Sequence, residues 1–358
     1  MLSRNQPLDL TNETSSASRS VSGNDEADKD RGPVSLFRPL PLLFHPHVQT
    51  VAALFWPSRR ESYPSTHRLL PLPDGDKLVV VVSTPSVWQP DRRTIVMVHG
   101  LCGCYGSRYM VRMAGKFYRR GLRAIRVNLR GCGSGVGLAR RPYHSGRSED
   151  VRHVIEWLAR ESPESPVTLV GFSLGGNVVL KMAGEDGARP SGRLDSLIAV
   201  SAPIDLSACS RLIEQPRNRI YDRYFVSRLR ATVQELHRFF PDLPPLVLPR
   251  QLTLRMFDDA YTAPRSGFRD AADYYARASS GPLVERIVVP TLLLSLRDDP
   301  FIAAAPFEQL PRRSNMDLCL TEYGGHLGFL GFTGRRLNYR WMDEQLIEWI
   351  TRHDAITF

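Results

Sequence analysis

The stretch that decides the fold is Pro166-Val167-Thr168-Leu169-Val170-Gly171-Phe172-Ser173-Leu174-Gly175-Gly176. Its first five residues form a short apolar run typical of a buried strand, and residues 177–182 continue as a helix. A serine between two glycines at such a strand-to-helix turn is the pattern of a nucleophile elbow. The turn is too tight for side chains at its flanks, so glycine is needed where backbone approaches backbone. The sequence therefore predicts that the hydroxyl of Ser173 is raised clear of a sheet and acts as a nucleophile.

Strands and helices alternate on both sides of this turn, after a predicted hairpin of residues 68–72 and 77–82 around Asp74-Gly75. The apolar runs predict further strands at 94–98, 124–127, 197–200, 288–294 and 316–320. The predicted helices include 109–120, one with apolar residues three and four apart from Val151 to Leu158, and a last one that buries Met342, Leu346, Trp349 and Ile350. Such alternation predicts an α/β protein with a mostly parallel, doubly wound sheet that is covered on both faces.

Three parts of the chain fall outside this pattern. Residues 1–32 are polar and charged, so we expect a disordered N-terminal tail before a single large domain at 33–358. Residues 37–56 are apolar but contain several prolines and show no sustained helical pattern, so we expect an arm packed on the domain. Residues at about 205–285 are helical, Arg-rich and aromatic, and we expect them to form a lid over the strand ends.

The bulk composition excludes some classes of protein. The chain has 358 residues, a net charge of +10 and five cysteines with no zinc-like pairing. The arginines are scattered without a nucleic-acid motif, so we expect surface charge and no nucleic-acid partner. No apolar stretch is long enough for a transmembrane helix, no secretory signal is evident, and the sparse cysteines favour a cytoplasmic location.

Two further residues complete a candidate catalytic set in the chain order serine, acid, histidine. An acidic pair, Asp298-Asp299, follows the predicted strand at 288–294, and His326 stands between glycines after the predicted strand at 316–320. An imidazole is needed to remove the proton of Ser173, and a carboxylate is needed to orient that imidazole. The Asp-Pro pair starts the next turn, which favours Asp299 as the acid and leaves Asp298 as a turn or capping residue.

An oxyanion hole needs two backbone amides near the nucleophile. Leu174, directly after the serine, is one predicted donor, and Leu101 in the loop His99-Gly100-Leu101-Cys102-Gly103 is the other. A second serine beside a histidine, in Tyr143-His144-Ser145-Gly146, is a conceivable rival pair, but no elbow surrounds it.

Together these motifs resemble the α/β-hydrolase superfamily, and more narrowly its YheT-like branch, over residues 37–352. The stretches that carry the resemblance are His47-Val48-Gln49-Thr50, residues 99–103, 128–132, 143–146 and 171–177, Tyr221-Asp222-Arg223-Tyr224-Phe225, residues 257–260, 298–301 and 325–329. The resemblance implies an eight-stranded sheet, a helical lid and a triad of Ser173, Asp299 and His326. It also implies relatives that act on acylglycerols or phospholipids.

We therefore predict a serine hydrolase that cleaves carboxylic esters of small acyl or lipid substrates through an acyl-enzyme. No metal or organic cofactor is expected, and contact with a membrane surface is compatible with this chemistry but not required by it. The alternatives are acyl transfer on the same triad and a catalytically silent lipid-binding or interaction module. The sequence does not fix the acyl chain length or the leaving group.

Overall fold

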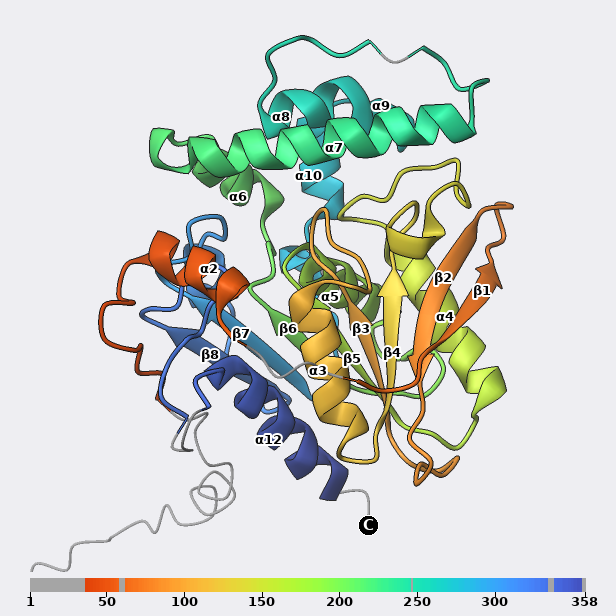
Figure 1. Cartoon of the computed structure of the whole chain (residues 1–358), viewed down its shortest axis with the longest axis vertical. Coiled ribbons are helices and arrows are strands. Elements are labelled where there is room, and N and C mark those ends of the chain that lie inside the picture. Colours follow the sequence, from red (N-terminus) through yellow and green to blue (C-terminus); the bar gives the residue numbers. More distant parts are fainter. Residues whose placement is uncertain (1–35, 58–61, 246, 334–337, 356–358) are drawn as a thin grey trace, which may run out of the picture. The chain divides into compact units, whose positions relative to one another are not determined.

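The computed structural model describes residues 36–57, 62–245, 247–333 and 338–355. The predicted tail at 1–32 lies outside these residues. The centre of the described part is one eight-stranded sheet in the order β1-β2-β4-β3-β5-β6-β7-β8 (Figure 1). Its strands are β1 (Thr66–Pro71), β2 (Lys77–Ser83), β3 (Thr94–Val98), β4 (Arg123–Asn128), β5 (Val167–Phe172), β6 (Leu194–Val200), β7 (Thr291–Leu296) and β8 (Met316–Thr321).

The pairing confirms the predicted fold class. The hairpin strands β1 and β2 are antiparallel, and β2 is also antiparallel to β4, whereas all pairs from β4 to β8 are parallel. Every residue of β3, β4, β5 and β7 is buried, as expected for parallel strands with helices on both faces. Branched aliphatic residues in these strands fill the space between sheet and helices.

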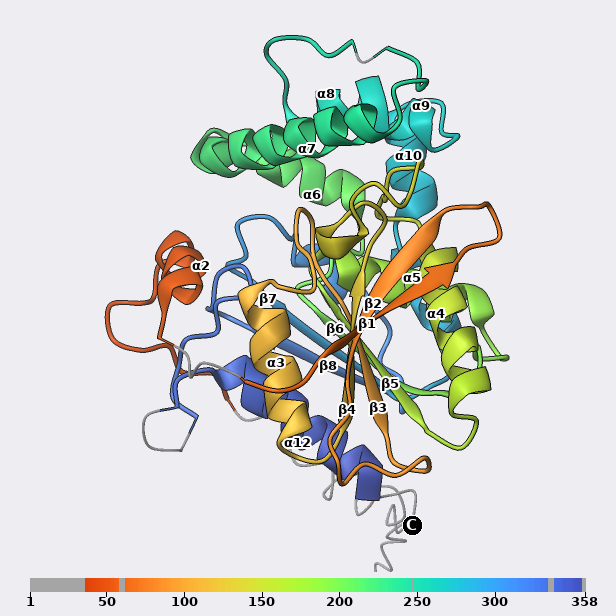
Figure 2. The ribbon, with the colours of Figure 1, turned by 45° about the vertical axis from the view of Figure 1, so that its right-hand side comes forward.

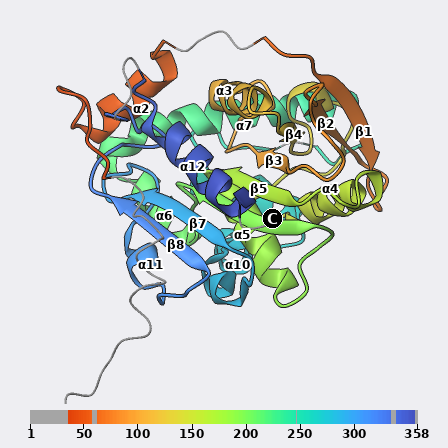
Figure 3. The ribbon, with the colours of Figure 1, turned by 90° about the horizontal axis from the view of Figure 1, so that it is seen from below.

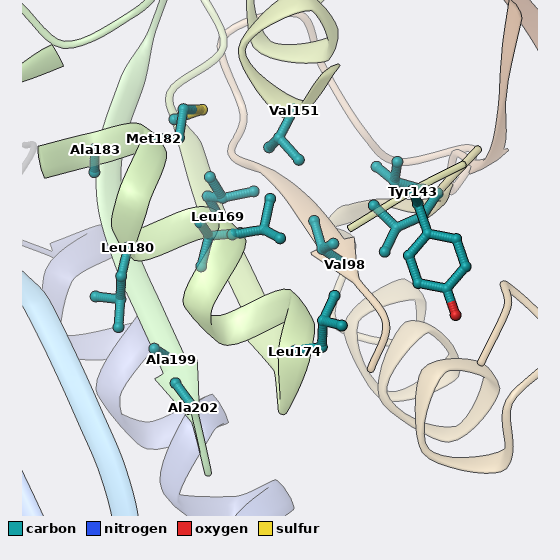
Figure 4. Close-up of a cluster of buried hydrophobic side chains, with 14 of the residues drawn as sticks. Val98, Tyr143, Val151, Leu169, Leu174, Leu180, Met182, Ala183, Ala199 and Ala202 are labelled. Carbon is teal, nitrogen blue, oxygen red and sulfur yellow. The ribbon is translucent and has the colours of Figure 1, made fainter. Parts of the chain in front are cut away.

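Helices cover both faces of the sheet (Figure 3). One face carries α3 (Arg108–Tyr118) and α12 (Trp341–Ala355), and the other carries α4 (Ser148–Glu161) and α5 (Leu174–Asp186). The apolar residues predicted for the last helix are all buried. Figure 4 shows part of the core under α4 and α5, which contains Val98, Val151, Leu169 and Leu174, the first residue of α5.

The insertion between β6 and β7 forms a separate helical layer (Figures 1 and 2). Its helices are α6 (Leu206–Ile213), α7 (Arg219–Phe239), α8 (Leu254–Phe257), α9 (Ala263–Arg265) and α10 (Ala271–Ala278). Both views place this layer beyond the carboxyl ends of the parallel strands, towards which β4 points. Ligands of open parallel sheets bind at this edge, so the layer lies over the expected position of a site.

The apolar segment before the sheet differs from its prediction. It contains a helix, α2 (Pro46–Phe55), although the prolines argued against one. Pro46 is the first residue of this helix, where a missing N–H costs nothing. The polarity of α2 is also reversed, because Gln49 and Thr50 are buried whereas Val48, Val51, Leu54 and Phe55 are exposed. This reversal hid the helix, since the usual pattern has apolar residues facing the core.

Candidate active site

Ser173 lies on the predicted turn between β5 and α5. Its backbone has φ 51° and ψ −125°, a conformation that costs a residue with a side chain about 1–3 kcal/mol. A Cβ on Gly175 would overlap the carbonyl group of Val98, and one on Gly171 would overlap the carbonyl oxygen of Gly175. The amide of Ser173 donates to the carbonyl of Val200 at 2.8 Å, which fixes the turn against the next strand. The two glycines therefore let the backbone close tightly under the half-buried hydroxyl of Ser173.

The structure brings Ser173, His326 and Asp299 together in a chain of hydrogen bonds. His326 Nε2 is 3.0 Å from Ser173 Oγ, and His326 Nδ1 is 2.9 Å from Asp299 Oδ2. The Asp299 side chain is fully buried, and its Oδ1 accepts the amides of Phe301 and Ile302 at 2.9 and 3.1 Å. The Phe301 ring also packs on the imidazole, with the ring centres 4.7 Å apart. These contacts hold one imidazole between a hydroxyl and a carboxylate.

The neighbouring carboxylate, Asp298, faces the loop that carries the histidine. Its oxygens accept the amides of Gly324 and Gly325 at 3.1 and 3.0 Å. Burial raises the pKa of Asp298, whereas these two backbone hydrogen bonds lower it. Asp298 is thus more than the local turn or capping residue that the sequence indicated, because it positions residues 26 and 27 places away in the chain.

The loop after β3 contains the predicted donor Leu101. His99 at its start is fully buried, and burial lowers the pKa of this imidazole to about 4, so it is neutral. His99 Nε2 accepts the amide of Leu129 at 3.1 Å, and Nδ1 is 2.8 Å from the carbonyl of Gly100. The amide of Cys102 donates to the Tyr143 hydroxyl at 3.0 Å. His99 and Tyr143 therefore brace the loop from two sides.

Both predicted amide donors have space in front of them. Leu101 and Leu174 line the same cavity as Ser173. In the described part of the chain, neither of their amides donates to a protein acceptor. In an oxyanion hole, two such amides donate hydrogen bonds to an oxygen of the bound substrate.

The cavity next to Ser173 lies under the helical layer and has a volume of about 100 Å³. Most of its lining is aliphatic or aromatic and comes from the elbow, from α6, α7 and α8, and from the turn after β7. These residues include Leu206, Ile213, Phe225, Leu229, Leu254, Phe301 and Ile302. Such a lining suits an apolar group next to the nucleophile.

One wall of this cavity contains a buried carboxyl group. Asp258 accepts a hydrogen bond from the Tyr275 hydroxyl at 2.7 Å. Burial raises the pKa of Asp258 from 3.8 to about 6. Since the folded state holds this proton more tightly than the unfolded chain, the contribution of Asp258 to stability is fully present below about pH 4 and is lost as the pH rises through 6.

We expect Asp258→Asn to raise the free energy of unfolding at pH 8 by about 1–3 kcal/mol, because each unit of pKa shift corresponds to about 1.4 kcal/mol. At pH 3, below both pKa values, the variant and the wild type are expected to differ little in stability, since both side chains are then mostly neutral in the folded and the unfolded state. Urea denaturation at the two pH values measures this difference. The control is Asp91→Asn, which removes an exposed carboxylate far away in the chain. An equal gain at both pH values would mean that charge is not the cause.

The reversed helix α2 supports the histidine loop from the other side. The amide of His326 donates to Thr50 Oγ1 at 2.8 Å. The Gln49 side chain donates to the carbonyl of Leu330 and accepts its amide, both at 3.0 Å. The polar residues of α2 therefore hold the residues on which the position of the imidazole depends. Sequence analysis noted these residues in a family motif but did not find this role.

We expect Thr50→Val to lower kcat several-fold with little change in KM, because a buried amide next to the imidazole loses its acceptor. An unsatisfied buried group costs about 1–3 kcal/mol, so a lower melting temperature is expected as well. Steady-state kinetics on p-nitrophenyl butyrate test this. Thr84→Val, at an exposed threonine after β2, should leave both quantities unchanged.

The backbone contacts of the rival pair, His144 and Ser145, indicate a structural role. Burial, followed by the charge of Arg147, lowers the pKa of His144 to about 3. The amide of Ser145 donates to the Tyr274 hydroxyl at 2.9 Å, and its carbonyl accepts Asn177 Nδ2 at 2.9 Å. Asn177 also donates to the carbonyl of Ala278. Asn177 thus ties the elbow helix to α10, a link that no local sequence pattern predicts.

Within the described ranges, no helix is both long and apolar enough to cross a bilayer. Among the same residues, no group of three or more His, Cys, Asp or Glu side chains is placed to hold a metal ion.

Similarity to known proteins agrees with this architecture. Residues 95–333 match the model of the alpha/beta hydrolase family. "Putative esterase YheT" of Escherichia coli is 33% identical over 315 residues, which cover 86% of this chain and 90% of that protein. The human "Phospholipase ABHD3" is 30% identical over 253 residues (69% of this chain, 61% of that protein), and the "Monoacylglycerol lipase" of Saccharomyces cerevisiae is 28% identical over 275 (74% and 60%).

Solved structures share the fold at low sequence identity. The hydrolase GrgF from Penicillium superposes with a TM-score of 0.55 at 18% identity, covering 82% of this chain and 99% of that chain. The Pyrococcus furiosus esterase Pf2001 superposes with a TM-score of 0.52 at 13% identity, covering 90% and 98%. Family model, relatives and fold agree: the chain belongs to the α/β-hydrolase family, in the YheT-like branch.

Proposed function

We propose that this carboxylic ester hydrolase works through a triad of Ser173, His326 and Asp299 and an acyl-enzyme intermediate. The observation that carries the proposal is the unbroken chain of hydrogen bonds, 3.0 Å from hydroxyl to imidazole and 2.9 Å from imidazole to carboxylate. Both distances are within the range for proton transfer and for fixing a tautomer.

Each group has a distinct task in the proposed reaction. The buried carboxylate of Asp299 accepts a hydrogen bond from the N–H at His326 Nδ1. The proton stays on Nδ1, so the unprotonated Nε2 can take the proton of Ser173. The Ser173 oxygen then attacks the ester carbonyl, and the imidazolium gives the proton to the departing alcohol. A water molecule, deprotonated by the same imidazole, releases the acyl group and restores the serine.

The amides of Leu101 and Leu174 are the proposed donors to the oxyanion. The loop of Leu101 is held rigidly by His99 and Tyr143, so its amide needs little reorganisation when negative charge develops. Loss of one such donor typically costs about 2.7–4 kcal/mol of transition-state stabilisation.

The lining of the cavity favours an apolar acyl group, and the insertion at about 205–285 acts as the proposed lid over it. The relatives named phospholipase and monoacylglycerol lipase support an ester or lipid substrate. The five free cysteines fit the expected cytoplasmic location.

Labelling with a fluorophosphonate probe tests the proposal directly. We expect stoichiometric modification that peptide mapping assigns to Ser173, and competition by esters of the preferred chain length. A panel of p-nitrophenyl esters of graded chain length then defines the acyl group. Modification at another serine, or none, would contradict the mechanism.

A further inference from the structure

The surface next to the active site is unusually apolar at α2 and the segment before it. Eighteen large hydrophobic residues are strongly exposed in the described part of the chain, and seven of them lie between residues 36 and 55: Leu36, Leu42, Phe44, Val48, Val51, Leu54 and Phe55. Single exposed apolar residues are ordinary, but a cluster of this kind marks a binding surface.

Four of these residues form one stripe on the outer side of α2. Counted from Val48, the next members follow after three, six and seven residues, which places them on one side of a helix. The exposed fractions are 45% for Val48, 45% for Val51, 57% for Leu54 and 73% for Phe55. The opposite side holds Gln49 and Thr50, which bind the histidine loop. We name the four exposed residues the α2 stripe. Because the polar side of the helix is bound to the histidine loop, the stripe faces away from the domain.

The stripe itself carries no acidic side chain. Between residues 36 and 57 the sequence contains one arginine, Arg38, two histidines, and no lysine, aspartate or glutamate. Arg108 lies over the Phe55 ring at 6.0 Å and donates to the carbonyl of Leu54. No acidic side chain on α2 offsets these arginines.

The start of the lid continues this character. His47 Nδ1 is 3.0 Å from the Tyr221 hydroxyl, and the two rings stack with centres 5.4 Å apart, so α2 adjoins the beginning of α7. That beginning exposes Ile220, Tyr224 and the side chains of Arg217, Arg219 and Arg223, while its acid Asp222 is buried. A surface hollow beside His45 and His47 is lined by residues of α6, of the segment after it and of the turn after β7, among them Arg211, Arg217, Arg297, Asp298 and Asp299.

We propose that the α2 stripe and its arginine rim dock the protein on the surface of an anionic phospholipid bilayer. A short, one-sided apolar helix with a basic border lies in the interface of a membrane, with its apolar side among the acyl chains. Each arginine near an anionic surface adds attraction that salt weakens. A protein partner would account for the apolar stripe, but the exposed arginines beside Phe55 and at the start of α7 favour an anionic bilayer.

The proposal deepens the proposed function, on which its second half rests. The stripe and the histidine loop lie on opposite sides of α2, because Thr50 on the inner side of this helix accepts the amide of His326. Docking through α2 therefore brings the hydrolase next to lipid esters in the bilayer, which identifies membrane lipids as the source of its substrate.

Vesicle flotation tests the docking with the full-length protein. We expect it to float with vesicles of phosphatidylcholine and phosphatidylglycerol, and several-fold less with phosphatidylcholine alone. The double variant Leu54→Glu/Phe55→Glu should reduce binding at least tenfold. The matched control is Leu69→Glu/Val87→Glu, which changes two exposed apolar residues away from α2, one of them on the strand at the other edge of the sheet. It should bind like the wild type.

Three outcomes would overturn the proposal: no flotation of the wild type, equal loss in both double variants, or equal binding to neutral and anionic vesicles. A dimer in light scattering that Leu54→Glu/Phe55→Glu dissociates, without vesicle binding, would assign the stripe to a second copy instead.

The outcome is separable from the proposed mechanism. Ser173→Ala should bind vesicles like the wild type, and Leu54→Glu/Phe55→Glu should hydrolyse soluble p-nitrophenyl butyrate like the wild type. Against vesicles that contain a lipid ester, the same double variant should lose most of its activity. Full activity there would overturn the second half of the proposal.

Discussion

Replacing Ser173 by alanine is expected to lower kcat for p-nitrophenyl butyrate by roughly 10⁴- to 10⁶-fold, because the other groups of a triad retain only a small part of its rate enhancement. The fold should be unchanged, since alanine keeps the Cβ and the backbone amide that donates to Val200. The melting temperature should therefore stay within a few degrees of the wild type.

Ser145→Ala is the informative companion to this variant. Ser145 lies next to a histidine and lines the same cavity, but burial lowers the pKa of His144 to about 3, so this imidazole is a poor base at neutral pH. We expect less than a tenfold change in kcat. A loss as large as that of Ser173→Ala would favour the rival pair, and retained activity in Ser173→Ala would remove Ser173 from the mechanism.

The second large effect is expected from Asp299→Asn, with a loss in kcat of roughly 10⁴-fold. An asparagine presents either an amide N–H to Nδ1 or a neutral oxygen, so the imidazole is no longer held with its proton on Nδ1 and its cation is not stabilised. Steady-state kinetics with the same ester measure the change.

Asp298→Asn distinguishes the two neighbouring acids. Asparagine still offers one oxygen to the amides of Gly324 and Gly325, so kcat should fall less than tenfold. Both variants should be compared at equal folded fraction, checked by thermal unfolding. If Asp298→Asn were the more damaging one, the assignment of the triad acid would be reversed.

Much of this architecture is local and therefore visible in the sequence. The elbow needs glycines because two backbones touch, and the core strands need branched aliphatic residues because both of their faces are buried. These demands act on consecutive residues, so the alternation, the sheet and the turn at Ser173 were predictable. The order of serine, acid and histidine also placed three side chains at the same edge of the sheet, where the structure has them.

The remaining features depend on partners far away in the chain. The choice between Asp298 and Asp299 is decided by which carboxylate reaches the imidazole, a matter of a single turn after β7. Asn177 and Tyr143 act through contacts with α10 and with the loop after β3. Helix α2 was missed because its polar residues face inward to bind the histidine loop, against the rule that apolar residues face the core.

The attachment of α2 has a consequence for how the protein matures. Gln49 and Leu330 are 281 positions apart, and they must meet before the loop of His326 is held in place. Contacts of such long sequence separation form late, after the intervening domain has closed. During synthesis α2 cannot form this contact until residues near 330 have left the ribosome. Since β8 ends at Thr321, nine residues before Leu330, the last strand and the partner of Gln49 are synthesised almost together. The nascent chain is therefore expected to gain esterase activity only after residues near 330 have left the ribosome.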